Sequence, residues 1–302
     1  EHRNLFPPEG ALILRGVAGT DEQLAGVTFR RNNFRRRDIV MTLQTLASHT
    51  RRDAFDANTL LLSARIEQAT TLIFQKRWSW SLGAELIGTD ELAYVASRAD
   101  YARQSYFIGS LAALLSYDRS DSLLDPTRGF RLTARVVPEF SFRGSPFAYV
   151  RTQLDGSIYR PVTERVVLAG RVRVGMMSGA QTAAIAPSRR YYSGGGASVR
   201  GFSYQAIGPL DVNGKPVGGR SLIEFAAEAR VRLGDFAIVP FVDAGNVTDA
   251  STPGLSDLRI GAGLGVRYHT NFGPIRVDVG TPVNRRSGDS LIGVYVSLGQ
   301  AF

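Results

Sequence analysis

The chain contains no cysteine, which excludes disulfide bonds, thiolate metal ligands and a cysteine nucleophile together. Histidine is almost as scarce, and His2, His49 and His269 are too scattered in the sequence to indicate a metal centre. Although 44% of the residues are hydrophobic, no uninterrupted apolar run approaches the roughly 20 residues that a membrane-spanning helix needs. We therefore expect neither a helical membrane protein nor a metal-dependent enzyme.

The net charge is +9, from 36 Lys and Arg against 27 Asp and Glu. Nucleic-acid-binding proteins often have such a balance, but their basic residues gather in one patch. Here the basic residues are spread along the chain, which is typical of a solvated or interior-facing surface. Nucleic acid is therefore not an expected partner.

The strongest signal is the alternation of apolar and polar residues with period two, which indicates β-strands. In the segment 221–233, Ile223 and Phe225 lie on one face, whereas Glu224 and Glu228 lie on the other. A bilayer satisfies no backbone hydrogen bonds, so a membrane barrel needs such strands, with an apolar face toward lipid and a polar face toward a wet interior. The pattern predicts an all-β fold.

Alternation of this kind recurs along the whole chain, and we expect a transmembrane antiparallel β-barrel. The fourteen segments are 11–19, 23–31, 38–48, 58–69, 78–89, 105–118, 129–141, 146–160, 165–177, 220–233, 235–246, 257–270, 273–284 and 290–302. Short connections alternate with longer ones, as they do in bacterial barrels. The connection 178–219, of 42 residues, is too long for an idle hairpin and predicts a functional loop.

The last segment contains Gly293, Gly299 and the terminal aromatic Phe302. Alternation places Phe302 on the apolar face, where it suits a girdle at the membrane interface. The two glycines either weaken pairing and packing of this strand or relieve crowding in the interior. The sequence leaves both interpretations open.

Two short motifs are similar to parts of enzymes. Residues 288–291 spell Gly-Asp-Ser-Leu, the nucleophile block of a family of serine esterases, but they fall in a turn and no suitably spaced Asp-x-x-His block follows. The glycines of 261–265 resemble a dinucleotide fingerprint, but they alternate along a predicted strand and no helix follows. We expect no catalytic residues and no nucleotide cofactor.

The long connection includes Arg200, in the run Arg-Tyr-Tyr-Ser-Gly-Gly-Gly-Ala-Ser-Val-Arg-Gly-Phe at 190–202. A guanidinium that enters a barrel interior without a carboxylate costs several kcal/mol. Alternation directs Glu228 and Asp243 inward on the next two segments, which makes them candidate partners. On spacing alone, a solvated Arg200 and two acids that only line the interior stay an open alternative.

This run resembles the sixth extracellular loop signature of the BamA/TamA outer-membrane assembly superfamily. The centre of that signature is Val-Arg-Gly-Phe, which here is Val199, Arg200, Gly201 and Phe202. The glycine pair at 218–219 and the run Gly-Pro-Ile-Arg-Val-Asp at 273–278 are most similar to the TamA family, the translocation and assembly module subunits. The likeness rests on sequence motifs over about residues 185–302. Over the earlier strands it rests only on the alternating pattern of apolar and polar residues.

The resemblance implies a sixteen-stranded barrel whose long loop folds inside, with Arg200 anchored by Glu228 and Asp243. It also implies amino-terminal POTRA domains, which we expect to be absent from residues 1–302. The opening residues Arg3 to Phe6 look like the turn after the second strand of the family, so we expect residues 1–302 to be a barrel domain with strands three to sixteen.

The implied function is the insertion or export of autotransporters and other β-barrel clients. In the family the first and last strands pair weakly, so a seam opens and a client strand adds to an exposed edge, which is β-augmentation. The implied partners are a TamB-like protein anchored in the inner membrane, unfolded client proteins and outer-membrane lipid.

Other functions stay possible at this stage. A BamA-like general insertase or the transporter of a two-partner secretion system belongs to the same superfamily. A passive porin would lack the motif at Arg200, and an outer-membrane esterase would need a His–Ser pair on one strand face.

Overall fold

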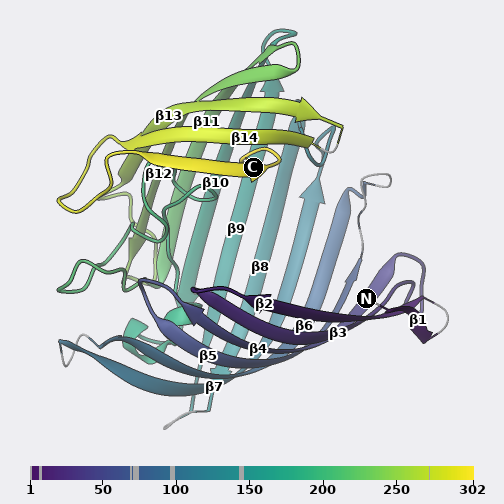
Figure 1. Cartoon of the computed structure of the whole chain (residues 1–302), viewed down its shortest axis with the longest axis vertical. Helices are drawn as coiled ribbons and strands as arrows, with labels where there is room; N and C mark the ends of the chain where they lie inside the picture. Colours follow the sequence, from purple (N-terminus) through teal and green to yellow (C-terminus); the bar gives the residue numbers. More distant parts are fainter. Residues whose placement is uncertain are drawn as a thin grey trace. The chain divides into compact units, whose positions relative to one another are not determined.

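The computed structural model describes residues 2–6, 9–68, 70, 75–95, 99–142, 146–271 and 273–302, and for residues 2–6 only the backbone. Within these residues fifteen strands form one sheet, in which each strand is hydrogen-bonded to the next in sequence order (Figure 1). This is the all-β architecture that the alternation predicts. No helix in the described part of the chain is long and apolar enough to cross a membrane.

Successive strands are joined by connections of very different length. The strands are β1 (His2–Phe6), β2 (Gly10–Ala18), β3 (Glu22–Arg31), β4 (Ile39–Arg51), β5 (Asp56–Gln68), β6 (Trp78–Val95), β7 (Asp100–Asp118), β8 (Gly129–Ser141), β9 (Phe147–Pro161), β10 (Val166–Ser178), β11 (Ser221–Leu233), β12 (Phe236–Thr248), β13 (Arg259–Thr270), β14 (Gly273–Pro282) and β15 (Gly293–Leu298). The connection between β10 and β11, hereafter the long loop, holds two short 3-10 helices, η1 (Thr182–Ala184) and η2 (Pro187–Arg189).

Each of the fourteen expected segments corresponds to one strand from β2 to β15. The expectation that Arg3 to Phe6 form a turn is wrong, because these residues belong to β1 and pair antiparallel with β2, with Arg3 opposite Ala11. The last strand is shorter than expected, since it ends at Leu298 and Gly299 follows with φ +85°. A positive φ is a conformation that glycine adopts without strain, so Gly299 turns the chain out of the strand.

The strands carry an apolar face that is exposed and a polar face that is partly covered by the long loop. Along β4 and β5, Leu43 and Leu62 are 42% and 46% exposed, whereas the neighbouring Gln44 and Ser63 point the other way. Water disfavours so many exposed large side chains, and a lipid bilayer does not. The alternation is therefore that of strands with one face toward lipid.

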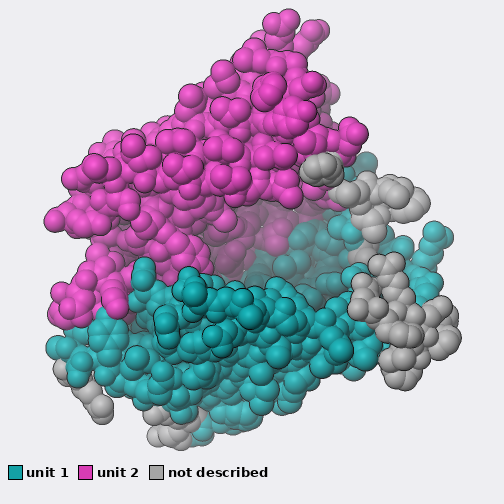
Figure 2. All heavy atoms as spheres, viewed as in Figure 1, with its two compact units in different colours: residues 1–116, 134–152, 177–190 teal, residues 117–133, 153–176, 191–302 magenta. Residues whose placement is uncertain are grey.

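The chain divides into two compact units (Figure 2). Unit 1 contains residues 1–116, 134–152 and 177–190, and unit 2 contains residues 117–133, 153–176 and 191–302. The long loop is divided between the two, since its first part belongs to unit 1 and the part from Tyr191 onward belongs to unit 2.

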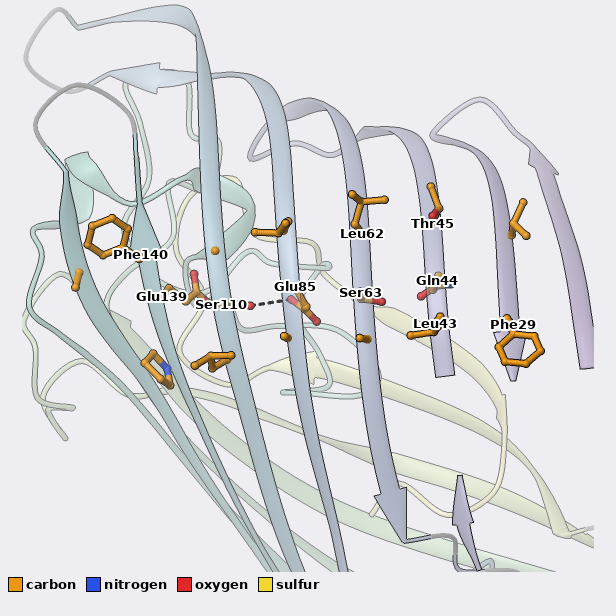
Figure 3. Close-up of a pocket in the computed structure, with 18 residues that line it drawn as sticks. Phe29, Leu43, Gln44, Thr45, Leu62, Ser63, Glu85, Ser110, Glu139 and Phe140 are labelled. Atoms are coloured by element: carbon orange, nitrogen blue, oxygen red, sulfur yellow. Dashed lines mark hydrogen bonds between the residues drawn. The ribbon is translucent and has the colours of Figure 1, made fainter. Parts of the chain in front are cut away.

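Unit 1 has a hollow of about 910 Å³ along strands β3 to β9 (Figure 3). Most of its lining is apolar, including Leu43, Leu62 and Phe140. Ala64 and Ala84 lie opposite each other on β5 and β6 and give the hollow a small-residue floor. Hydrocarbon suits this lining better than a polar ligand does.

Candidate functional site

Three acids project from three strands of unit 2 onto the polar face. Glu228 is on β11, Asp243 is on β12 and Asp278 is on β14, and they are 3%, 1% and 0% exposed. Each one alternates with apolar neighbours that point to the opposite face, so strand periodicity alone sets their common direction. Because an isolated buried carboxylate is costly, such a group requires cationic partners.

Arg200 of the long loop supplies the central cation and is itself 1% exposed. Its Nε and Nη2 donate to the two carboxylate oxygens of Asp243 at 2.7 and 2.8 Å. Its Nη1 donates to Glu228 at 2.6 Å and to Asp278 at 3.1 Å. The ring of Phe241 lies beneath the guanidinium, with 3.6 Å from Cζ to the ring centroid. Two-point pairing and a stacked ring hold the guanidinium in one orientation.

Further arginines complete this acid cluster. Arg230 donates from Nε to Glu228 at 3.1 Å, Arg267 donates from Nη1 to Asp278, and Nε of Arg276 lies 3.4 Å from Asp278. Among the described residues, four arginines including Arg200 therefore meet three acids, which leaves one positive charge in excess (4 − 3). Glu228 and Asp278 each pair with more than one arginine, so the loss of either acid would remove an ion pair from several guanidiniums at once.

Glycines let the backbone of the loop lie directly on β13. Gly201 has φ +97°, a conformation that favours glycine. A Cβ at Gly261 would lie 1.8 Å from the carbonyl oxygen of Arg200, and a Cβ at Gly280 would lie 3.0 Å from the amide nitrogen of Gly201. Of the glycines that are similar to a dinucleotide fingerprint, Gly261 thus makes room for the loop, whereas a Cβ at Gly265 would meet the side chains of Asp278 and Arg267.

A fourth acid, Glu224 on β11, holds the turn that precedes Arg200. Its carboxylate is 0% exposed and accepts from the hydroxyl of Ser193 at 2.8 Å and from that of Ser198. Arg173 donates to it from Nη1 at 3.2 Å, and Nη2 of Arg171 lies 3.5 Å away. The sequence reasoning missed this role, although alternation already directs Glu224 to the same face as Glu228.

The Val-Arg-Gly-Phe motif is also held by apolar packing and by the last strand. Val199, Phe202 and Ile207 form a buried cluster and are 0%, 1% and 2% exposed. The hydroxyl of Tyr295 on β15 accepts from the backbone N–H of Gly201 at 3.0 Å and donates to the carbonyl of Phe202 at 2.7 Å. One side chain of β15 therefore hydrogen-bonds to the backbone of two consecutive residues of the motif, Gly201 and Phe202.

The three singled-out residues at the end of the chain have different environments. A Cβ at Gly293 would lie 2.3 Å from the Tyr295 hydroxyl, which supports relief of crowding as the reason for this glycine. Gly299 turns the chain, and its N–H donates to the carbonyl of Pro274 at 2.8 Å. Phe302 does not lie on the apolar face as expected. Its ring centroid is 5.5 Å from Cζ of Arg171 and 5.6 Å from Cζ of Arg230, because the turn at Gly299 breaks the alternation.

The motif at 288–291 contacts the long loop and β13. The hydroxyl of Ser290 lies 2.9 Å from that of Ser203, and Asp289 accepts from Nη2 of Arg259 at 2.6 Å. In the part of the chain that is described, no three His, Asp or Glu side chains are grouped so as to hold a metal ion.

The fold and the site define a class of protein: an antiparallel transmembrane β-barrel whose long loop is anchored by an arginine on the polar face. The model of the Omp85 superfamily domain matches residues 11–302, and the chain belongs to that superfamily. It is accordingly an integral β-barrel of the bacterial outer membrane.

Two curated relatives illustrate the membership. The outer membrane protein assembly factor BamA of Nitratidesulfovibrio vulgaris is 28% identical over 215 residues, which cover 66% of this chain and 26% of that protein. The SAM50-like protein CG7639 of Drosophila melanogaster is 27% identical over 208 residues, which cover 64% of this chain and 46% of that protein. The chain thus matches less than half the length of each relative.

A solved structure shows the same fold. BamA from Haemophilus ducreyi lacking POTRA domains 1-3 has a TM-score of 0.75 with 16% sequence identity, over 94% of this chain and 63% of that one.

Proposed function

We propose that this chain is the membrane domain of a factor that inserts or exports β-barrel client proteins at the outer membrane. The observation that carries the proposal is the buried pairing of Arg200 with Asp243, Glu228 and Asp278. A loop that only covered a pore would not need four hydrogen bonds from one guanidinium to three acids on three strands. The similarity to an outer membrane protein assembly factor supports the same conclusion.

In the proposed mechanism the last strand, β15, takes part in a seam that opens toward lipid. A client strand adds to the exposed edge through backbone hydrogen bonds, which give affinity with little demand on side-chain sequence. The contacts of Arg200 with Glu228, Asp243 and Asp278 keep β11, β12 and β14 in register while the seam moves. The barrel itself needs no nucleotide or metal for this exchange of strand pairs.

Within the superfamily, we assign the chain to a TamA-like role, with autotransporters among its clients and a TamB-like partner in the inner membrane. The runs at 218–219 and 273–278 support this assignment. The second candidate is a BamA-like general insertase, which the 28% identity to BamA favours. Depletion of the protein separates the two, because a general insertase is needed for porin assembly and a TamA-like factor only for a subset of clients.

The experiment that tests the proposal is Arg200→Ala in the full-length protein in its native membrane. We expect surface delivery of an autotransporter client to be lost while the barrel keeps its heat-modifiable mobility in gels. The matched control is Arg220→Ala, since Arg220 lies in the same loop but donates from Nε to the backbone carbonyl of Asp249. Undisturbed delivery in Arg200→Ala would contradict the proposal.

A further inference from the structure

The long loop has a second set of buried contacts before it reaches Arg200. Ile185 and Ala186, which join η1 to η2, are 0% and 1% exposed. Ala186 packs against Ile87 on β6 and against Tyr106 and Ile108 on β7, which form an apolar cluster on the polar face of unit 1. A patch of apolar side chains on a wet face is stabilised by such a cover.

A buried acid lies beside this apolar patch and accepts two hydrogen bonds from the loop. Glu91 on β6 is 1% exposed. The backbone N–H of Ser188 donates to one of its carboxylate oxygens at 3.0 Å, and the hydroxyl of Ser188 donates to the other at 2.6 Å. The hydroxyl of Thr89 adds a third bond at 3.1 Å. Both oxygens of this carboxylate are therefore used, and two of the three donors belong to the loop.

The next residue, Arg189, pairs with a second buried acid. Its Nε donates to Glu139 of β8 at 3.1 Å, and its Nη2 donates to the other oxygen of the same carboxylate. Glu139 has 0% side-chain exposure and also accepts from the hydroxyl of Tyr149 on β9. Glu85 on β6, which Figure 3 labels together with Glu139, lies 4.0 Å from Nη2 of Arg189. Burial of the acid and two-point pairing make this contact as specific as that of Arg200.

We propose that Ile185 to Arg189 form a second anchor of the long loop, which stays docked when the Arg200 anchor is released. All described partners of the second anchor belong to unit 1, whereas those of Arg200 belong to unit 2. Residues 190–199 join the two anchors. The part of the loop that moves with the Val-Arg-Gly-Phe motif therefore begins after the second anchor and includes the turn that Glu224 holds through Ser193 and Ser198. The second anchor keeps the loop on the polar face during this movement.

The test is hydrogen exchange, measured by mass spectrometry on the full-length protein in lipid nanodiscs. It follows one peptide over 183–191 and another over 196–204. In Arg200→Ala we expect faster exchange in the second peptide and unchanged exchange in the first. In the double variant Glu91→Gln, Arg189→Ala we expect the first peptide to exchange faster by roughly tenfold or more, and the second to be unchanged.

Two controls make the result specific. Asp90→Asn changes the neighbouring acid on β6, whose 40%-exposed side chain pairs with Arg103, and it should alter neither peptide. Arg189→Lys keeps the charge but cannot pair at two points, and it should give a smaller increase than Arg189→Ala. Heat-modifiable mobility verifies that each variant is folded.

The proposal is overturned if Arg200→Ala accelerates both peptides equally, since the loop would then have a single anchor. It is also overturned if the double variant leaves the first peptide protected. Because the measurement needs no client protein, its result tests the second anchor independently of the proposed function.

Discussion

At the scale of the residue, Asp278 joins three arginines. Its carboxylate accepts from Arg200 at 3.1 Å and from Arg267, and it lies 3.4 Å from Nε of Arg276. The side chain of Asp278 has 0% exposure, so solvent does not reach the arginines that it pairs with. Removal of its charge would raise the excess of positive charge in the cluster from one to two.

We expect Asp278→Asn to lower the free energy of unfolding by roughly 3–5 kcal/mol, because removing one partner of a buried pair leaves uncompensated charge. Urea unfolding in lipid vesicles, followed by gel mobility, measures this change. Asp53→Asn, at an exposed position between β4 and β5, is the control and should leave the midpoint unchanged. Equal midpoints for the two variants would show that Asp278 is not needed to balance the arginines.

Sequence reasoning reached some members of the cluster and missed others for a physical reason. Alternation identifies every inward acid, including Glu228 and Asp243 and equally Glu224 and Asp278. Which of these acids meets the loop depends on the path of the loop across the strands, and no local pattern encodes that path. The pairing of Arg189 with Glu139 was missed for the same reason, because the two residues are 50 positions apart.

At the scale of the element, β15 is the last strand in the sheet order, and the hydroxyl of its Tyr295 hydrogen-bonds to the loop. Tyr295 accepts from Gly201 and donates to Phe202, and the absence of a side chain at Gly293 leaves room for that hydroxyl. The position of β15 and the position of the motif are therefore linked by two hydrogen bonds.

We expect Tyr295→Phe to reduce client delivery while the barrel stays folded. The phenyl ring fills the same space, but the N–H of Gly201 and the carbonyl of Phe202 lose their partner, which costs about 1–3 kcal/mol for each buried group. Delivery of an autotransporter client measures the effect. The control is Tyr268→Phe, which removes a hydroxyl from a 45%-exposed ring that packs on Phe236. If both variants deliver clients normally, the link between β15 and the loop has no role in delivery.

Periodicity placed most strand boundaries to within about three residues, but β6 runs on to Val95 where 78–89 was expected, and β7 begins at Asp100 where 105–118 was expected. Two further differences lie at the ends of the sheet. β8 begins at Gly129 and ends at Ser141, as alternation predicts. The turn expected at Arg3 to Phe6 is instead a strand, because pairing with β2 satisfies its backbone. The last strand stops early at Gly299, where backbone conformation overrides a side-chain pattern that runs on to Phe302.

At the scale of the whole molecule, the apolar face recurs from strand to strand. Along β5, Leu60 and Leu62 are 54% and 46% exposed, and along β13 Leu264 is 52% exposed. A bilayer stabilises this arrangement, because lipid surrounds the apolar side chains and the strands form the backbone hydrogen bonds among themselves.

We expect Leu62→Arg to lower the stability of the membrane-inserted protein by roughly 2–4 kcal/mol, because a guanidinium at the lipid face must be desolvated. Ser63→Arg, one residue away on the polar face, should have a much smaller effect. The measurement is the fraction of protein that folds into vesicles at increasing urea. Equal losses in the two variants would mean that Leu62 does not face lipid.

The spacing of Arg200 and its partners along the chain also sets the order in which the protein can be completed. Glu228, Asp243 and Asp278 follow Arg200 by 28, 43 and 78 residues. Closing such long loops costs entropy before any ion pair rewards it, so contacts of this range form late in folding. The guanidinium cannot make its full set of hydrogen bonds until β14, which carries Asp278, has joined the sheet. The full set of Arg200 contacts therefore requires that the carboxyl-terminal strands are assembled, and in a chain stalled before β14 the Val-Arg-Gly-Phe motif is incompletely held and more open to proteases than the second anchor.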